Sequence, residues 1–165
     1  MDAVDLFTQH WNRERPDVDV SPMAVIGRIQ RLSRLFEQDL KRFFSDFGME
    51  FWEFDVLATL RRSGSEAGLT AGALIKVAMV TSGAITNRID RLVAKGWIER
   101  QPCPEDRRVI RVRLTPEGRK MIDDVLPKHM ENEQRLLASL DMDSREQLAG
   151  LLRTLAESLG DGAPD

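Results

Sequence analysis

Apolar side chains recur every three or four residues through the first third of the chain, which is the spacing of an amphipathic helix. A short helix is predicted over 2–11. After a proline-containing break, a long helix is predicted to about Phe47, with Ser21 as its N-cap and Pro22 in its first turn. Gly48 is expected to end it. A helix of this length carries more apolar surface than one small domain usually covers, which favours a partner subunit.

The pattern changes in the middle of the chain. Short helices are predicted over 51–62, 71–77 and 81–95, and the last of these ends in a cationic turn followed by glycine. Alternation then replaces the helical period in 97–100 and 109–114, which are predicted to be strands joined by a polar loop. Two short helices followed by a basic hairpin predict a mainly α fold with a small β-wing, a winged helix-turn-helix.

Polar residues mark the starts of the remaining helices. Thr70 is predicted to cap the helix over 71–77, and Thr115 one that extends past Leu137. Asp143 is predicted to cap a last helix through Leu159. The predicted organisation is an added N-terminal helix and linker (1–20), a dimerisation helix (21–50), a winged DNA-binding lobe (51–118), C-terminal dimerisation helices (119–160) and a disordered tail (161–165).

Charge is distributed unevenly along the 165 residues. The net charge is −3, yet residues 76–120 hold eleven Lys and Arg against five Asp and Glu, a local balance of +6. The rest of the chain therefore carries −9. A basic segment within an acidic protein indicates a localised phosphate contact, although a solvated charged face would have the same composition.

Other classes of protein fit the composition poorly. The chain has two His, one Cys and no Tyr, and neither a phosphate-binding glycine loop nor a metal-ligand motif is found in it. An enzyme, a metal site and a cofactor are therefore not expected. No apolar run is long enough to span a membrane, and the N-terminus does not resemble a targeting peptide. We expect a cytoplasmic protein.

The helix over 81–95 has two different faces. Ile85, Ile89, Leu92 and Val93 fall on the side predicted to pack inward. The opposite side is small and polar near the N-terminus, as a helix that enters a major groove requires. In the wing, two arginines lie at the predicted tip, where cations can enter a minor groove, and Asp106 is placed to form an ion pair with one of them. The predicted DNA contacts are Ser82, Gly83, Thr86, Asn87, Arg91, Arg107 and Arg108.

Several of these stretches resemble the MarR family of bacterial regulators. The matching motifs are TSGAITNRIDRL at 81–92, GWIER at 96–100, DRR at 106–108 and LTPEG at 114–118, and the resemblance covers about 22–160. It implies a homodimer built from the terminal helices. It also implies binding to a palindromic operator in double-stranded DNA and, usually, repression of a neighbouring gene.

The N-terminal sequence QHWNRERPDVD at 9–19 resembles the extra helix of the urate-responsive branch of that family, which includes regulators of major facilitator transporters. The branch often has Gln where this chain has His10. The resemblance implies that Trp11, Asp55 and Arg88 line a site for urate or a related purine such as xanthine or hypoxanthine.

The residues themselves permit such a site. Asp55 and Thr59 share one side of the predicted helix over 51–62, and a buried carboxylate needs a partner. Arg88 lies at the edge of the inward face of its helix, so an Asp55–Arg88 contact is predicted. A planar purine anion would stack on Trp11, be held by Arg88 and repel Asp55, which would displace the helix over 81–95 (the recognition helix).

Other interpretations remain open from the sequence. Trp11 could be a core residue of a docked helix, and Asp55 and Arg88 could form a structural ion pair. The effector could be another anionic or phenolic ligand. Oxidation of Cys103, which lies between Pro102 and Pro104 in the wing, could also regulate the protein. Finally, the winged domain could serve protein interaction alone.

Overall fold

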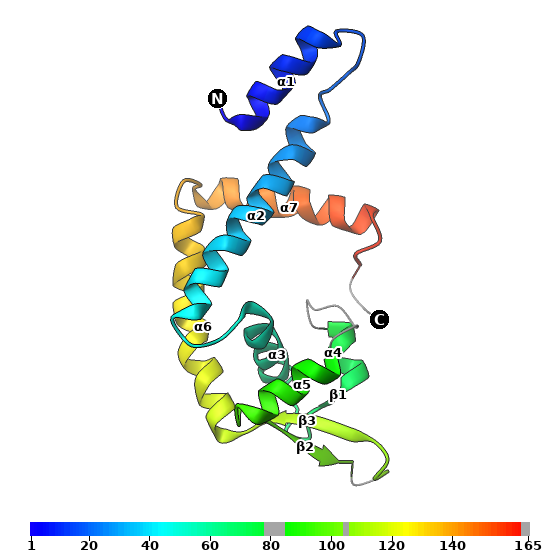
Figure 1. Ribbon diagram of the computed structural model, residues 1–165, viewed down its shortest axis with the longest axis vertical. Coiled ribbons are helices and arrows are strands. Elements are labelled where there is room, and N and C mark those ends of the chain that lie inside the picture. The colour runs from blue at the N-terminus through cyan, green and yellow to red at the C-terminus, as the bar shows by residue number, and fades with distance from the viewer. Residues whose placement is uncertain (78–84, 104–105, 163–165) are drawn as a thin grey trace. The chain divides into compact units, whose positions relative to one another are not determined.

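The computed structural model describes residues 1–77, 85–103 and 106–162 (Figure 1). It forms two compact units, Met1–Asp46 and Phe47–Asp165. Helices dominate both, and the second unit also contains a three-stranded antiparallel sheet. The predicted fold class, mainly α with a small β-wing, is confirmed. Among the described residues, no helix is both long enough and apolar enough to cross a membrane.

The first unit is a pair of helices, α1 (Ala3–Glu14) and α2 (Met23–Ser45). Asp2 caps α1 through hydrogen bonds from the backbone N–H groups of Val4 and Asp5. Arg28 of α2 forms ion pairs with Asp2 at 2.9 Å and Asp5 at 2.6 Å. A Cβ at Gly27 would lie 3.3 Å from a methyl group of the buried Val4, so glycine allows the close approach of α1 to α2.

The prediction that Ser21 caps the long helix is wrong. Pro22 occupies the N-cap position, where no side-chain hydrogen bond is made, and α2 begins at Met23. The hydroxyl group of Ser21 donates to Asp19 instead. The predicted stop is close to the observed one, because α2 ends at Ser45 and Gly48 adopts a left-handed φ of 64°.

The second unit contains the winged lobe and two C-terminal helices. Its elements are α3 (Phe51–Arg62), β1 (Leu69–Thr70), α4 (Ala71–Val77), α5 (Ile85–Ala94), β2 (Ile98–Pro102), β3 (Ile110–Leu114), α6 (Pro116–Leu136) and α7 (Met142–Ser158). The bounds of α3 and α4 are those predicted, and Thr70 caps α4 by accepting a hydrogen bond from Ala73 N at 3.1 Å. The start predicted for the helix over 81–95 lies outside the described residues.

The sheet has the order β1-β3-β2. The hairpin pairs Ile98 with Leu114 at one end and Pro102 with Ile110 at the other. Strand β1 was not predicted, because its two residues are too few to show alternation. A Cβ at Gly68, directly before β1, would lie 2.2 Å from the carbonyl oxygen of Val112, so only glycine permits this third strand to pair.

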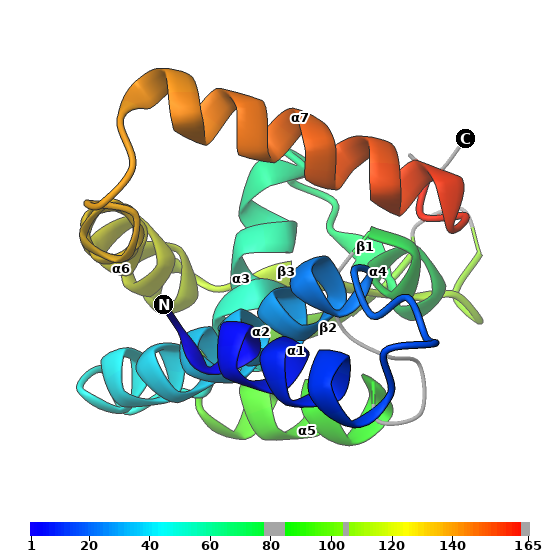
Figure 2. The same cartoon turned by 90° about the horizontal axis from the view of Figure 1, so that it is seen from above.

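The C-terminal helices differ from the prediction at their ends. Helix α6 begins at the predicted cap, Thr115, but ends at Leu136 rather than beyond Leu137. The predicted cap of α7 is also wrong: Asp141, not Asp143, accepts the hydrogen bond from Ser144 N at 2.8 Å. Helix α7 leaves the end of α6 and runs crosswise to it (Figure 2). None of its residues is buried.

Gly118 brings the first turn of α6 against the bend that precedes β2. A Cβ at this position would lie 1.8 Å from the carbonyl oxygen of Trp97. Neither backbone can move freely, because Trp97 O accepts from Thr115 N at 3.1 Å and the Thr115 hydroxyl donates to Gly96 O at 2.6 Å. The contact therefore requires a residue without a side chain at position 118.

We expect Gly118→Ala to lower the free energy of unfolding by about 1–3 kcal/mol, the usual cost of forced overpacking. Gly72→Ala in α4 is the matched control, since its nearest contact would be a relaxed 4.0 Å from Thr70 Oγ1. Urea unfolding of both variants measures the difference. Equal stability of the two variants would contradict the account.

His129 of α6 is buried against α3. Its ring makes an edge contact with Phe54 at a centroid distance of 4.8 Å, and its Nε2 lies 3.2 Å from Glu133 Oε1. Burial lowers the pKa of His129 below its usual 6.5, and the Glu133 carboxylate partly offsets this effect. The unfolded chain therefore binds a proton at this residue more readily than the folded chain.

The protein should consequently lose stability as the pH falls from 6.5 towards the folded-state pKa of His129. Melting temperatures measured between pH 7.5 and 5.5 test this expectation. His129→Gln should flatten the pH dependence, and His10→Gln, at an exposed position, should leave it intact. A slope that both variants retain would show that His129 is not its source.

Candidate nucleic-acid interface and ligand site

Helix α5 presents one apolar and one polar face, as predicted. Ile85, Ile89 and Leu92 are buried in the core of the second unit. Thr86 and Asn87 are exposed on the other side, close to the start of the described part of the helix. Ser82 and Gly83, also predicted to contact DNA, lie outside the described residues. The exposed polar groups can donate to and accept from base edges, and their short side chains permit close approach.

The turn of the wing exposes Arg107 and Arg108. The predicted ion pair of Asp106 with a wing arginine is wrong, since none of the ion pairs formed between described residues involves Asp106. Its carboxylate instead accepts a hydrogen bond from the backbone N–H of Arg108 at 3.0 Å, and its carbonyl accepts from Val109 N at 2.9 Å. Asp106 therefore shapes the turn and leaves the guanidinium groups at the surface.

Arginine side chains of the wing connect it to α5, connect its two strands to each other, and bind the segment before β1. Arg100 of β2 contacts Asp90 of α5 at 2.5 Å, and Arg113 of β3 contacts Glu99 of β2 at 2.5 Å. Arg111 donates to the carbonyl oxygen of Gly68 at 3.2 Å. These three arginines thus stabilise the wing, and the first also neutralises an acidic group on the face of α5 that carries Asn87.

Arg91, a predicted DNA contact, is directed towards α3. Its NH2 lies 2.7 Å from Glu50 Oε1, and its guanidinium lies 4.8 Å from the ring centroid of Trp52. The hydrogen bond from Arg91, followed by that from Trp52, lowers the pKa of Glu50, so this carboxylate is charged at neutral pH. Sequence reasoning missed the partners of Arg91, although the spacing of Arg88, Arg91 and Lys95 places all three on one side of the helix predicted over 81–95.

The predicted ligand residues of the second unit lie on α3 and α5. Asp55 and Thr59 are 3% and 1% exposed, one helical turn apart. The guanidinium of Arg88 lies 5.3 Å from the ring centroid of Trp52. The predicted Asp55–Arg88 ion pair is wrong, because the described residues form no such pair and the aromatic ring of Trp52 receives the cation instead.

Thr59 Oγ1 and Arg88 NH1 are buried and have no hydrogen-bond partner among the described residues. Such atoms are uncommon in proteins, since their desolvation is normally compensated. Trp11 belongs to α1 in the first unit and has 49% of its surface exposed. Cys103, the predicted alternative sensor, is only 6% exposed, which leaves little thiol surface for an oxidant.

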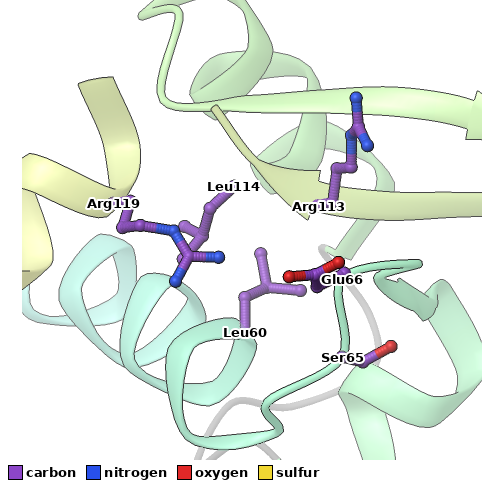
Figure 3. Close-up of a pocket in the computed structure, with 6 residues that line it drawn as sticks. All are labelled: Leu60, Ser65, Glu66, Arg113, Leu114 and Arg119. Carbon is purple, nitrogen blue, oxygen red and sulfur yellow. The ribbon is translucent and has the colours of Figure 1, made fainter. Parts of the chain in front are cut away.

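A shallow hollow in the second unit lies elsewhere. Its lining comes from α3, the loop that follows it, β3 and the start of α6: Leu60, Ser65, Glu66, Arg113, Leu114 and Arg119 (Figure 3). The guanidinium of Arg113 is held by Glu99. None of the residues that line the hollow belongs to the predicted ligand site.

Known proteins resemble this chain in sequence and in structure. A model described as MarR family matches residues 47–109. The HTH-type transcriptional regulator PecS of Dickeya dadantii is 38% identical over 93% of this chain and 92% of its own length. The multiple antibiotic resistance protein MarR of Salmonella typhimurium is 34% identical over 79% of this chain and 90% of its own length. A mutant MarR from E. coli, solved in complex with operator DNA, covers 88% of this chain and 96% of its own, at 30% identity and a TM-score of 0.71.

Proposed function

The chain belongs to the MarR family of DNA-binding transcriptional regulators, and from this premise we propose that it is a repressor released from its operator by a small planar anion of the urate class. The single observation that carries the DNA-binding part is the exposed polar face of α5 beside an exposed basic wing turn. Thr86 and Asn87, together with Ser82 and Gly83 before them, would read base edges in a major groove. Arg107 and Arg108 would enter the adjacent minor groove.

Exposed apolar side chains on α2 and α7 support a homodimer. A monomer would leave these surfaces in water, and a second copy would cover them. Two lobes related by a two-fold axis would then bind the two halves of a palindromic operator. The side chains concerned are Val25, Ile26, Leu32 and Leu35 of α2 and Leu148, Leu151 and Leu152 of α7.

Thr59 Oγ1 and Arg88 NH1, which have no hydrogen-bond partner in the described part of the chain, support the ligand part of the proposal. A purine oxygen would accept from Arg88 NH1, and a purine N–H or oxygen would satisfy Thr59 Oγ1. The resemblance to the urate-responsive branch adds Trp11 as a stacking surface. Bound negative charge would draw Arg88 from the ring of Trp52 and repel the Asp55 carboxylate. Because Arg88 belongs to the recognition helix, the liganded state would hold this helix in a position that binds DNA less well.

Titration of the protein–operator complex tests the proposal. The full-length protein is bound to a fluorescent promoter fragment from upstream of its own gene, and urate, xanthine, hypoxanthine and the phenolic anion salicylate are added in turn. We expect release by urate or xanthine at lower concentrations than by salicylate. Release by salicylate alone would replace the purine class with a phenolic one, and release by none would remove the ligand proposal.

A further inference from the structure

Two cations of α5 and Lys95, which directly follows it, all contact the segment at the start of α3. Arg88 and Arg91 lie over the two-ring side chain of Trp52, at 5.3 and 4.8 Å from a ring centroid. Lys95 Nζ reaches the carboxylate of Glu53 at 2.7 Å and the carbonyl oxygen of Gly48 at 3.0 Å. Arg91, which the sequence predicted to contact DNA, is therefore held by groups of the protein itself, together with Arg88 and Lys95.

Glu53 forms the buried part of this contact. Its side chain is fully buried, and a carboxylate in such a place is costly unless it is paired. Lys95 supplies the opposite charge, and the backbone N–H of Glu50 donates to Oε2 at 2.9 Å. Arg91 NH2 lies 4.0 Å from Oε1. The carboxylate thus joins the N-terminus of α3 to Lys95, the residue that directly follows α5.

Glu50 forms the exposed part. One carboxylate oxygen accepts from Arg91 at 2.7 Å, and the other accepts from the indole Nε1 of Trp52 at 2.6 Å. Glu50 therefore fixes both the ring and the guanidinium that lies over it. The arrangement uses both oxygens of Glu50, so neither Trp52 nor Arg91 can turn away without breaking a charge-assisted hydrogen bond.

We propose that these residues form an α3–α5 clamp (Glu50, Trp52, Glu53, Arg91 and Lys95) that sets the position of the recognition helix on DNA, with Glu50 and Arg91 as positioning residues. The proposal rests on the DNA-binding role of α5 proposed above. In the alternative, Arg91 contacts a DNA phosphate group directly, and its ion pair with Glu50 forms only in the absence of DNA.

The two alternatives predict opposite effects of removing the negative charge of Glu50. If Glu50 competes with DNA for Arg91, Glu50→Gln frees a cation and strengthens operator binding. If Glu50 positions the helix, the same change loosens α5 and weakens binding. The number of phosphate contacts separates them further, because each contact contributes about 0.9 to the slope of log affinity against log salt.

Operator affinity of full-length variants over a series of KCl concentrations is the test. We expect Glu50→Gln to weaken binding by about two- to fivefold, the range of a half-exposed ion pair, with an unchanged salt slope. Arg91→Glu should weaken it by about tenfold or more, because it places a third carboxylate beside Glu50 and Glu53. The exchange of charges in Glu50→Arg with Arg91→Glu should recover most of that loss. Glu131→Gln, at an exposed position of α6, is the control and should bind as the wild type does.

Tighter binding by Glu50→Gln, or an exchanged variant no better than Arg91→Glu, would overturn the clamp and make Arg91 a DNA contact. Both side chains are about half exposed, so melting temperatures near that of the wild type are expected and verify that each variant is folded. If the wild type binds the operator and the Glu50 and Arg91 variants bind it equally well, this inference is overturned and the proposed function is not. A wild type that shifts no operator fragment would overturn the proposed function together with it.

Discussion

Replacing both wing arginines, Arg107→Ala with Arg108→Ala, is expected to weaken operator binding by about ten- to a hundredfold and to reduce the salt slope by about two. Both guanidinium groups lie at the surface of the hairpin turn, where Asp106 bonds to the backbone and not to their charges. Each would neutralise a phosphate or enter a minor groove. Loss of both removes this electrostatic contribution without disturbing the core.

Fluorescence polarisation with a labelled promoter fragment measures the effect. The control is Arg13→Ala with Arg153→Ala, which changes the net charge by the same two units at exposed positions of α1 and α7. We expect this control to bind within about twofold of the wild type, because long-range effects of exposed charges are screened by salt. A similar loss in both double variants would show that net charge, and not the wing, determines affinity.

Replacing Arg88 with alanine is expected to abolish the response to urate while operator affinity without ligand changes by less than about fivefold. Arg88 is half-buried, and a cation–π contact that is not fully desolvated contributes about 0.5–1 kcal/mol. Arg88 NH1 is a buried donor with no partner among the residues that the structure describes, and in the proposed complex this donor binds the anion. We do not expect Arg88 to contact DNA, because its guanidinium lies over the ring of Trp52. The variant therefore separates the ligand response from DNA binding.

The measurement is the urate concentration that releases half of the bound operator. Arg88→Lys is the matched variant, because it keeps the charge and loses the fork of donors, so it should respond only at higher urate concentrations. An Arg88→Ala protein released at the same urate concentration as the wild type would remove Arg88 from the ligand site. A protein that no longer binds the operator at all would make Arg88 part of the DNA-binding surface.

Local sequence was sufficient for most elements of the winged lobe. The helices α3 and α4 have the predicted bounds because their apolar spacing and caps are local signals. Strand β1 was missed because its pairing depends on the approach of Gly68 to Val112, residues far apart in the sequence. The cap of α7 was misplaced by two residues because Asp141 and Asp143 both suit an N-cap, and only the backbone geometry selects Asp141.

The sequence predicted which helix face each residue of the candidate site lies on, but not which side chains contact one another. The sequence placed Asp55 and Thr59 on one side of α3, and both are buried. It also predicted that Arg88 would point into the protein, yet the partner is Trp52 rather than Asp55. Helical periodicity gives the direction of a side chain and not the choice among several groups within its reach. For the same reason the sequence did not predict that Arg91, assigned to DNA, forms an ion pair with Glu50.

Amide hydrogen exchange with and without operator DNA tests most directly whether α5 and the β2–β3 wing together bind the duplex. We predict that saturating operator slows exchange in peptides that cover Ile85–Ala94 and Ile98–Leu114, and that a shuffled fragment of equal length gives weaker protection. Protection confined to other segments, or equal protection by both fragments, would contradict the assignment of this surface to sequence-specific DNA binding.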